Sequence, residues 1–158
     1  LVKKDQVEYQ KKAMDLVEYV RQRLEFFDEV AHFSNLTFEY TPDNFPAWIH
    51  FNETKLQRVI DNNITNAIKY TKSAQVIRVG VRSNIDACWF YIESKSTKIH
   101  DVDKIFEAYY RERKKRDGFG LGLSLVKSIC DEEGVEIEIS SSDEQTRFEY
   151  RFAKRESV

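Results

Sequence analysis

The amino-acid sequence predicts a two-layer α+β sandwich, in which helices cover one face of a mixed sheet. Three observations lead to this fold class. Apolar residues recur every three or four positions in several separate segments, strict alternation marks two pairs of segments joined by short turns, and two more short strands lie between the first helices. The 158 residues, 41% of them hydrophobic, suffice for one domain with a real core.

The first part of the chain holds a charged segment and then a helix. Residues 1–13 are polar, and we expect them to be the end of a preceding dimerisation helix or a linker, with the domain itself spanning residues 14–158. From Met14 to His32 apolar side chains return at helical spacing, which predicts an amphipathic helix.

The middle of the chain predicts strands around a second helix. A turn with two prolines separates the first two strands, and a polar turn joins the other two as a hairpin. The helix is capped by Asn52 or Thr54 and runs to about Thr71. The four strands are Leu36–Tyr40, Ala47–Phe51, Val76–Arg82 and Ala87–Glu93.

The last third predicts helices and a closing hairpin. A short helical segment covers about Val102–Tyr110, and a basic run without apolar residues, Arg111–Asp117, is expected to be a loop. The next helix, Leu121–Glu133, stops near Gly134. The closing hairpin pairs Val135–Ser140 with Arg147–Phe152.

Composition excludes several classes of function. A net charge of −2 gives no general attraction to nucleic acid, so no nucleic-acid partner is expected. No apolar run approaches the ~20 residues that cross a bilayer, and no signal peptide is visible. The two cysteines, Cys88 and Cys130, lie in apolar surroundings and predict buried, reduced thiols. These features fit a cytoplasmic domain.

Three closely spaced glycines, Gly118, Gly120 and Gly122, precede an apolar helical segment. Glycine lets a backbone approach a bulky anion, and a helix N-terminus attracts phosphate. Turns and helix starts also use glycine, so the pattern alone is weak. The basic run just before it strengthens the prediction of a phosphate-binding loop, although a basic run by itself is more often a solvated loop.

The helix that ends near Thr71 carries a second set of candidate residues. Asn62, Asn66, Lys69 and Tyr70 share one helical face, opposite a face of apolar residues. Amide oxygens suit Mg²⁺, an ammonium suits phosphate and a phenol ring suits a nucleoside. A solvated polar face is the alternative, but asparagine has weak helix propensity, and a role outside folding would account for its repeated use here.

Three motifs in order carry a resemblance to a known family. Residues 56–71 (LQRVIDNNITNAIKYT) resemble the N box of sensor histidine kinases, residues 105–111 (IFEAYYR) their F box and residues 118–127 (GFGLGLSLVK) their G2 box. The similarity covers about residues 14–152. It implies the Bergerat-type fold of the ATP-binding catalytic domain, which the family shares with gyrase, chaperone and mismatch-repair ATPases.

The resemblance implies roles for individual residues. Asn66 would be the main Mg²⁺ ligand, with Asn62 beside the metal and its water. In a bound ATP, Lys69 would contact the phosphates and Tyr70 the nucleoside, while Arg111 would reach the γ-phosphate from a lid that Phe106 anchors. The second glycine box would wrap the triphosphate and brace the following helix through Gly118, Gly120, Leu121, Gly122 and Leu123.

One motif of the family is altered. Its first glycine box reads Asp-x-Gly-x-Gly, and its aspartate accepts a hydrogen bond from the adenine amino group, whereas this chain has Ser94-Lys95-Ser96-Thr97-Lys98 at that place. A hydroxyl still accepts a hydrogen bond but lacks the charge, which costs on the order of 1–3 kcal/mol of base binding. Glu93 is adjacent, but alternation points it to the other face.

The chemistry that the resemblance implies is phosphoryl transfer to a histidine. Asn62 stands where hydrolytic branches carry a glutamate base, so rapid ATP hydrolysis is not expected. His32, His50 and His100 lack the surroundings of a phosphoacceptor, and the acceptor is expected on an absent dimerisation domain of a homodimeric, membrane-anchored bacterial sensor. A response regulator would follow downstream. Two alternatives remain: a degenerate regulatory or docking module, and a hydrolytic ATPase or serine kinase of the same superfamily.

Overall fold

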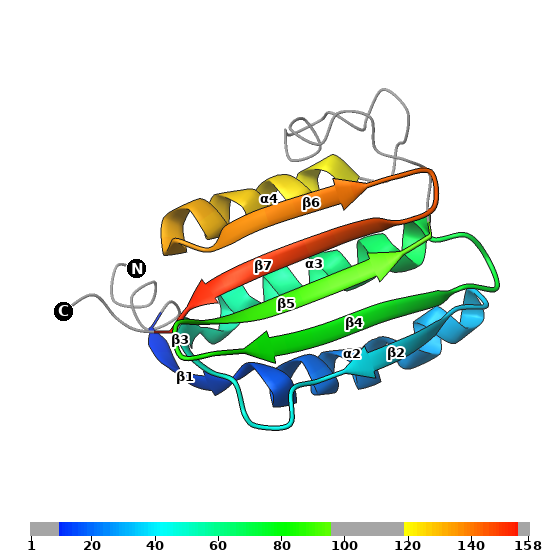
Figure 1. The fold of residues 1–158 in the computed structure, drawn as a ribbon. Coiled ribbons are helices and arrows are strands. Elements are labelled where there is room, and N and C mark those ends of the chain that lie inside the picture. Colours follow the sequence, from blue (N-terminus) through cyan, green and yellow to red (C-terminus); the bar gives the residue numbers. More distant parts are fainter. Residues whose placement is uncertain (1–9, 96–118, 155–158) are drawn as a thin grey trace.

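The computed structural model describes residues 10–95 and 119–154, and it confirms the two-layer α+β sandwich (Figure 1). The elements are β1 (Lys11–Asp15), α2 (Leu16–Phe33), β2 (Thr37–Thr41), β3 (Trp48–Asn52), α3 (Glu53–Tyr70), β4 (Val76–Ser83), β5 (Ala87–Ser94), α4 (Phe119–Glu133), β6 (Glu136–Ser141) and β7 (Thr146–Ala153). Five strands form one sheet in the order β2-β4-β5-β7-β6, and α2, α3 and α4 lie on one of its faces. The sheet is mixed as predicted, because β2 runs parallel to β4 and the other pairs are antiparallel.

The start of the domain differs from the sequence prediction. Residues 11–13, expected to belong to a preceding helix or linker, begin β1, which pairs with β3 in a separate two-stranded sheet. The helix expected from Met14 begins two residues later, at Leu16. The carboxylate of Asp15 explains this boundary, since it accepts hydrogen bonds from the backbone N–H of Val17 (3.1 Å) and of Ala47 (2.9 Å).

The other described elements follow the sequence prediction closely. Asn52 caps α3, and its Oδ1 accepts a hydrogen bond from the backbone N–H of Lys55 at 2.8 Å. The hairpins β4–β5 and β6–β7 form as expected. Helix α4 ends before Gly134, whose φ of 72° suits glycine after a helix. The short helix expected at 102–110 lies outside the described residues.

The core lies between the helices and the inner face of the sheet. Strand β5 shows the alternation: Cys88, Phe90 and Ile92 are buried toward the helices, and the residues between them face outward. Cys88 and Cys130 are free and buried, which confirms the prediction of thiols. Burial raises the pKa of Cys130 to about 12, so this thiol stays protonated.

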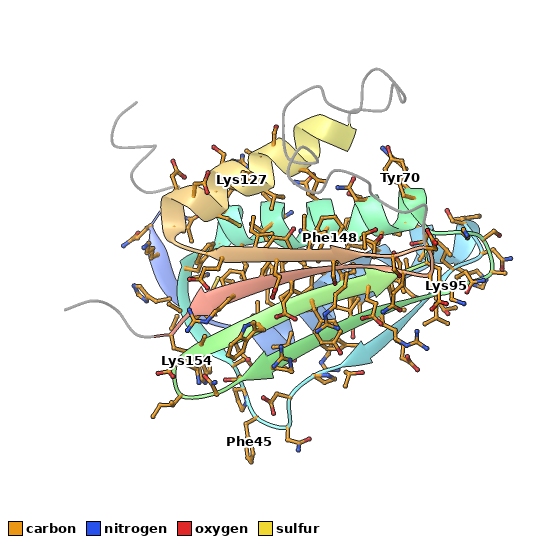
Figure 2. All side chains as sticks on the ribbon, turned by 45° about the horizontal axis from the view of Figure 1, so that its top comes forward. Phe45, Tyr70, Lys95, Lys127, Phe148 and Lys154 are labelled. Carbon is orange, nitrogen blue, oxygen red and sulfur yellow. The ribbon has the colours of Figure 1, made fainter. Side chains whose placement is uncertain are left out.

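One end of the sandwich gathers the segments that carry the predicted motifs. The C-terminus of α3, the end of β5, the start of β7 and the start of α4 all lie there (Figure 1). In Figure 2, Tyr70 and Lys95 lie toward this end, and Phe45 and Lys154 toward the other. The backbone N–H of Lys72 donates to the carbonyl of Lys95 at 2.9 Å, which joins the segment after α3 to the segment after β5. We call this region the motif end.

Candidate functional site

Asn66 lies in the last third of α3, at the motif end, and the nitrogen of its amide group is unsatisfied among the described residues. Its Nδ2 atom is buried and has no hydrogen-bond partner among the described residues. Leaving a buried polar group without a partner costs about 1–3 kcal/mol, so such a group is a candidate for contact with a ligand. At ordinary precision an amide can be turned by 180°, and either its oxygen or its nitrogen can then meet a ligand.

Asn62, one turn earlier, lies directly against Gly122 of α4. Its Nδ2 donates to the carbonyl of Arg58 at 2.7 Å, so its Oδ1 is directed away from its own helix axis. A Cβ added to Gly122 would lie 2.8 Å from this Oδ1 atom. Glycine at this position therefore lets the two motif-bearing helices approach, and it brings the N box and the second glycine box into contact.

The second glycine box is more helical than the sequence predicts. Helix α4 begins at Phe119, two residues before the predicted start at Leu121, so Gly120 lies inside its first turn and not in a loop before it. Leu121 and Gly122 are helical as predicted. The cost of glycine in a helix, about 1 kcal/mol relative to alanine, is offset at Gly122 by the close contact with α3. Leu123 is fully buried, in agreement with its expected role behind the glycines.

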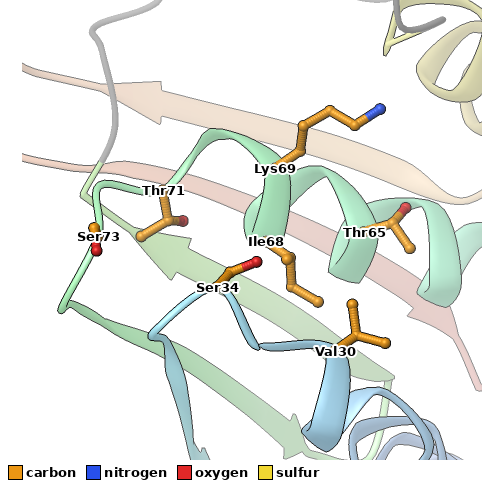
Figure 3. A pocket seen from close by; sticks show the side chains of 7 residues that line it. All are labelled: Val30, Ser34, Thr65, Ile68, Lys69, Thr71 and Ser73. Carbon is orange, nitrogen blue, oxygen red and sulfur yellow. The ribbon is translucent and has the colours of Figure 1, made fainter. Parts of the chain in front are cut away.

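Lys69 and Tyr70 occupy the last turn of α3. Lys69 is exposed and Tyr70 is half-buried. Figure 3 shows the Lys69 ammonium extending away from a hollow of about 440 Å³ between the ends of α2 and α3. The hollow is lined by Val30, Ser34, Thr65, Ile68, Lys69, Thr71 and Ser73. Its position beside α2 separates it from the face of α3 that packs on α4.

Ser94, at the place of the family's aspartate, is the last residue of β5 and is half-buried. Alternation along β5 places it on the face of the sheet that carries the helices. Glu93 lies on the opposite face, as predicted, where its carboxylate accepts a hydrogen bond from Arg147 at 3.0 Å. Glu93 therefore does not substitute for the missing aspartate.

Thr146, which no sequence motif singles out, lies directly across from Ser94 in the β5–β7 register. Thr146 is only 3% exposed, and its hydroxyl lies 2.7 Å from that of Ser141 on β6. The alternation of Thr146, Phe148 and Tyr150 could have placed it on the inner face, but only the register reveals its position opposite Ser94.

A third asparagine of α3, Asn63, has a structural role. Its Oδ1 accepts a hydrogen bond from the Tyr150 hydroxyl at 2.9 Å, and its Nδ2 donates to the carbonyl of Val59 at 2.8 Å. Asn63 is 3% exposed and Tyr150 is fully buried. Burial raises the pKa of Tyr150 far above its ordinary value, so the phenol remains a donor. This pair ties α3 to β7 through the centre of the core.

An ion cluster joins α3, α4 and β1 at the end opposite the motif residues. Lys55 lies 2.7 Å from Glu133, which also contacts Lys11 at 3.1 Å, and both Lys55 and Glu133 are largely shielded from solvent. Burial alone would raise the pKa of Glu133, but its hydrogen bonds from Lys55 and Lys11 outweigh burial and lower the pKa. The cluster stabilises the packing that sets Asn62 against Gly122.

Three of the predicted site residues, Phe106, Arg111 and Gly118, lie outside the described residues, as does the lid between them. His32 lies in the last turn of α2 and His50 in β3, and both are exposed. Within residues 10–95 and 119–154, no three His, Cys, Asp or Glu side chains gather as a metal site. Among these residues, the side chains at the motif end that fit a divalent cation are the amides of Asn62 and Asn66.

The sequence and fold match known proteins. Residues 51–156 match the family model described as histidine kinase-, DNA gyrase B-, and HSP90-like ATPase. The chain is 28% identical over 112 residues to the probable sensor kinase SilS of Salmonella typhimurium, covering 67% of this chain and 22% of SilS. It is 25% identical over 145 residues to the sensor histidine kinase CusS of Escherichia coli K12, covering 88% of this chain and 30% of CusS.

Solved structures agree with these relatives in fold. The nucleotide-free catalytic domain of the histidine kinase ThkA superposes with a TM-score of 0.83 at 24% identity, covering 92% of this chain and 96% of that domain. ThkA has also been solved in complex with a response regulator protein, TrrA. The superposition on that structure has a TM-score of 0.78 at 20% identity, and it covers 93% of this chain and 42% of that chain.

The fold and the family match define an ATP-binding domain. The chain belongs to the family of histidine kinase-, DNA gyrase B-, and HSP90-like ATPases, and its relatives within that family are sensor histidine kinases. It spans less than a third of the length of SilS and CusS. In the part of the chain that the structure describes, no helix is both long and apolar enough to span a bilayer.

Proposed function

We propose that this domain binds Mg²⁺-ATP at the motif end and supplies the γ-phosphoryl group to a histidine on the dimerisation domain of a two-component sensor kinase. The observation that carries the proposal is the buried amide nitrogen of Asn66, which has no hydrogen-bond partner in the described part of the chain. Asn66 lies on the same helical face as Asn62, against which Gly122 packs. Family membership supports the nucleotide, and the sensor kinase relatives support the phosphoryl acceptor.

Different residues of this chain would contact the metal ion, the phosphates and the nucleoside. Asn66 and Asn62 would hold Mg²⁺ through their amide oxygens, and the bound ion would neutralise charge on the triphosphate. Lys69 and Arg111 add positive charge for the phosphates, and the backbone of Gly118, Gly120 and Gly122 gives them room. Tyr70 and Ser94 would contact the nucleoside, and Phe106 would anchor the start of the lid. Leu121 and the buried Leu123 would brace the helix behind the glycines.

The amide of Asn62 also favours transfer over hydrolysis. Its Nδ2 is engaged with the Arg58 carbonyl, and a carboxamide does not accept a proton at neutral pH, so it activates no water. The acceptor histidine comes from another domain, since His32 and His50 are surface residues of α2 and β3. The sensor would act as a homodimer on the cytoplasmic side of a membrane, and a response regulator would receive the phosphoryl group, as the ThkA–TrrA pair suggests.

A calorimetric titration with Mg²⁺ and a non-hydrolysable ATP analogue tests the proposal. Asn66→Ala removes the amide, and we expect its dissociation constant to rise by about 10- to 100-fold, the range for losing a metal-ligating or charge-assisted contact. Gln57→Ala, an exposed change on the same helix, is the matched control and leaves binding unchanged. Equal binding by wild type and Asn66→Ala would contradict the proposal.

The altered first glycine box favours a second candidate function, a regulatory or docking module with weak nucleotide binding. Ser94 is the observation behind it, because the described structure offers no carboxylate from Glu93 in compensation. The same titration separates the two candidates: a wild-type domain that binds the ATP analogue no better than Asn66→Ala would support the docking module.

A further inference from the structure

A second buried polar atom lacks a partner, and it lies away from the proposed nucleotide site. In the described part of the chain, two buried side-chain atoms have no hydrogen-bond partner, Asn66 Nδ2 and Thr71 Oγ1. Thr71 directly follows the last turn of α3 and is 9% exposed. It lines the hollow of about 440 Å³ between the ends of α2 and α3. The hollow therefore contains a hydroxyl that the described fold leaves unsatisfied.

The lining of the hollow combines aliphatic and hydroxyl groups. Figure 3 shows Val30 of α2 and Ile68 of α3 pointing toward each other, with the hydroxyls of Thr71 and Ser34 beside them. Ser73, in the turn after α3, adds another hydroxyl. A concave site with an aliphatic surface and a few polar groups is typical of sites that bind small molecules.

The electrostatics of the hollow disfavour a ligand of either charge. Ser34 and Thr71 are the C-cap residues of α2 and α3, so both helices end at the hollow. A helix C-terminus carries roughly half an elementary negative charge, which repels an anion. Lys69 also lines the hollow and repels a cation, and none of the described lining residues carries a carboxylate. A neutral group that forms hydrogen bonds fits this environment best.

We propose that the hollow binds a small neutral molecule with a short branched aliphatic group and an alcohol or amide head. The aliphatic group packs on Val30 and Ile68, and the head forms a hydrogen bond with the Thr71 hydroxyl, which can both donate and accept. Water alone would satisfy Thr71 but would leave the aliphatic side chains hydrated, whereas this ligand matches both. The inference does not depend on nucleotide binding, because the hollow lies on the α2 side of α3.

Three probes with the same branched carbon chain test the chemistry of the site. Isobutanol, isobutyrate and isobutylammonium are neutral, anionic and cationic at about pH 7. Each is titrated without nucleotide into the isotope-labelled full chain, and the backbone amide signals are followed by NMR. We expect isobutanol to shift the signals of Ser34, Thr71 and Ser73 with a dissociation constant on the order of 10 mM. The two ions should bind at least about fivefold more weakly.

Thr71→Val retains the shape of the side chain and removes the hydroxyl. We expect isobutanol to bind about tenfold more weakly and the equilibrium constant for unfolding to fall at least about fivefold, because an unsatisfied buried group is lost. Thr41→Val makes the same change at an exposed position of β2 outside the hollow and leaves isobutanol binding unchanged. Val30→Phe fills the hollow from its exposed side and abolishes binding, although it retains the hydroxyl.

Each outcome supports or overturns the inference. Equal binding of isobutanol by wild type and Thr71→Val overturns it, and so does a larger unfolding constant in Thr71→Val, since the hydroxyl would then already have a partner. Tighter binding of either ion overturns the neutral class of ligand. If wild type binds none of the probes, the hollow holds only water and the site is excluded. Val30→Phe decides the matter if Thr71→Val fails to fold. The proposed function stands or falls separately, by the titration with the ATP analogue.

Discussion

Two asparagines three residues apart on α3 differ in whether the fold satisfies their amide groups: Asn63 is structural, and Asn66 is the proposed ligand contact. Asn63 points into the core, where Tyr150 and the Val59 carbonyl satisfy its oxygen and its nitrogen. Asn66 lies on the flank of the same helix with a buried nitrogen that has no partner among the described residues. Asparagine has weak helix propensity and destabilises the helix at both positions, but only at Asn63 do hydrogen bonds within the fold offset this loss.

The difference teaches that hydrogen-bond satisfaction separates structural from functional polar groups better than burial does. The Nδ2 atoms of both amides are shielded from water, so the burial of that atom alone does not distinguish them. A satisfied amide adds to stability, and an unsatisfied one subtracts from it until a ligand arrives. Substitutions of the two residues are therefore expected to have opposite effects on folding and binding.

The largest expected effect on stability comes from Asn63→Ala. The change leaves the buried Tyr150 hydroxyl without its acceptor and creates a small cavity, so we expect the domain to lose about 2–4 kcal/mol of unfolding free energy. Asn66→Ala removes an unsatisfied group and is expected to change stability by less than about 1 kcal/mol in either direction. Urea denaturation followed by circular dichroism measures both.

Tyr150→Phe supplies the control for the Asn63 effect. It removes the donor and retains the ring that stacks on Phe90, and the double variant with Asn63→Ala should cost clearly less than the sum of the single changes. Strict additivity of the two losses would show that the Asn63–Tyr150 hydrogen bond contributes little to stability. It would contradict the structural role that distinguishes Asn63 from Asn66.

The ion cluster at Glu133 should behave like Asn63, because its charges are satisfied within the fold. Glu133→Gln is expected to cost about 1–3 kcal/mol of stability at neutral pH, since Lys55 loses its shortest partner in a shielded position. Because the folded pKa of Glu133 lies below its ordinary value of 4.5, its contribution is present above that value and is lost as the pH falls through the folded pKa.

Unfolding curves of wild type and Glu133→Gln between neutral pH and pH 3 test this prediction. The two proteins should differ most at neutral pH and converge on acidification. Glu144→Gln, in the exposed turn before β7, is the control and should match the wild type throughout. A difference that persists unchanged to pH 3 would show that the carboxylate charge is not what stabilises this packing.

Gly122→Ala tests whether Asn62, which lies against Gly122, takes part in binding. The added Cβ would meet the tip of the Asn62 side chain, which can rotate, so the packing cost is small and is offset by the better helix propensity of alanine. We expect little change in melting temperature but a roughly 3- to 10-fold weaker binding of the Mg²⁺-ATP analogue, because the displaced Asn62 amide no longer points toward α4. Unchanged binding would separate Asn62 from the metal site.

The sequence predicted the local elements better than the relations between them. The alternation in Ala87–Ser94 and the periodicity of α3 depend on neighbouring residues, and the structure confirms both. The pairing of Lys11–Asp15 with β3 depends on contacts between residues more than 30 positions apart, and a polar segment gives no sign of it. For the same reason Asn62 and Lys69 could be placed on one helical face, but Thr146 opposite Ser94 could not be found.

The three neighbouring asparagines show the same limit at the candidate site. The repeated use of asparagine suggested a role outside folding for all three, which is wrong for Asn63, because no pattern in the sequence pairs it with Tyr150, 87 residues later. The satisfaction of a polar group is a tertiary property, so helical spacing and the family motif could name Asn62 and Asn66 as candidates but could not show which amide atom lacks a partner. The roles of Phe106, Arg111 and Gly118 stay predictions from that motif.

The smallest expected effect on stability concerns Ala74, in the turn between α3 and β4. Its backbone is strained, and this strain does not come from an unpaired polar group. Its φ of 63° is left-handed, which costs a residue with a Cβ about 1 kcal/mol, although its N–H donates to the Asn35 carbonyl at 3.0 Å. Ala74→Gly relieves this strain but adds freedom to the unfolded chain, so we expect a net gain of only about 0.5 kcal/mol in stability. Equilibrium denaturation measures the gain, and titration with the ATP analogue should show no change, since the turn faces the α2 side of α3. Weaker nucleotide binding in Ala74→Gly would mean that the strained turn also positions Lys69 and Tyr70. The distinction between residues that stabilise the fold and residues that contact the ligand would then not hold for this turn.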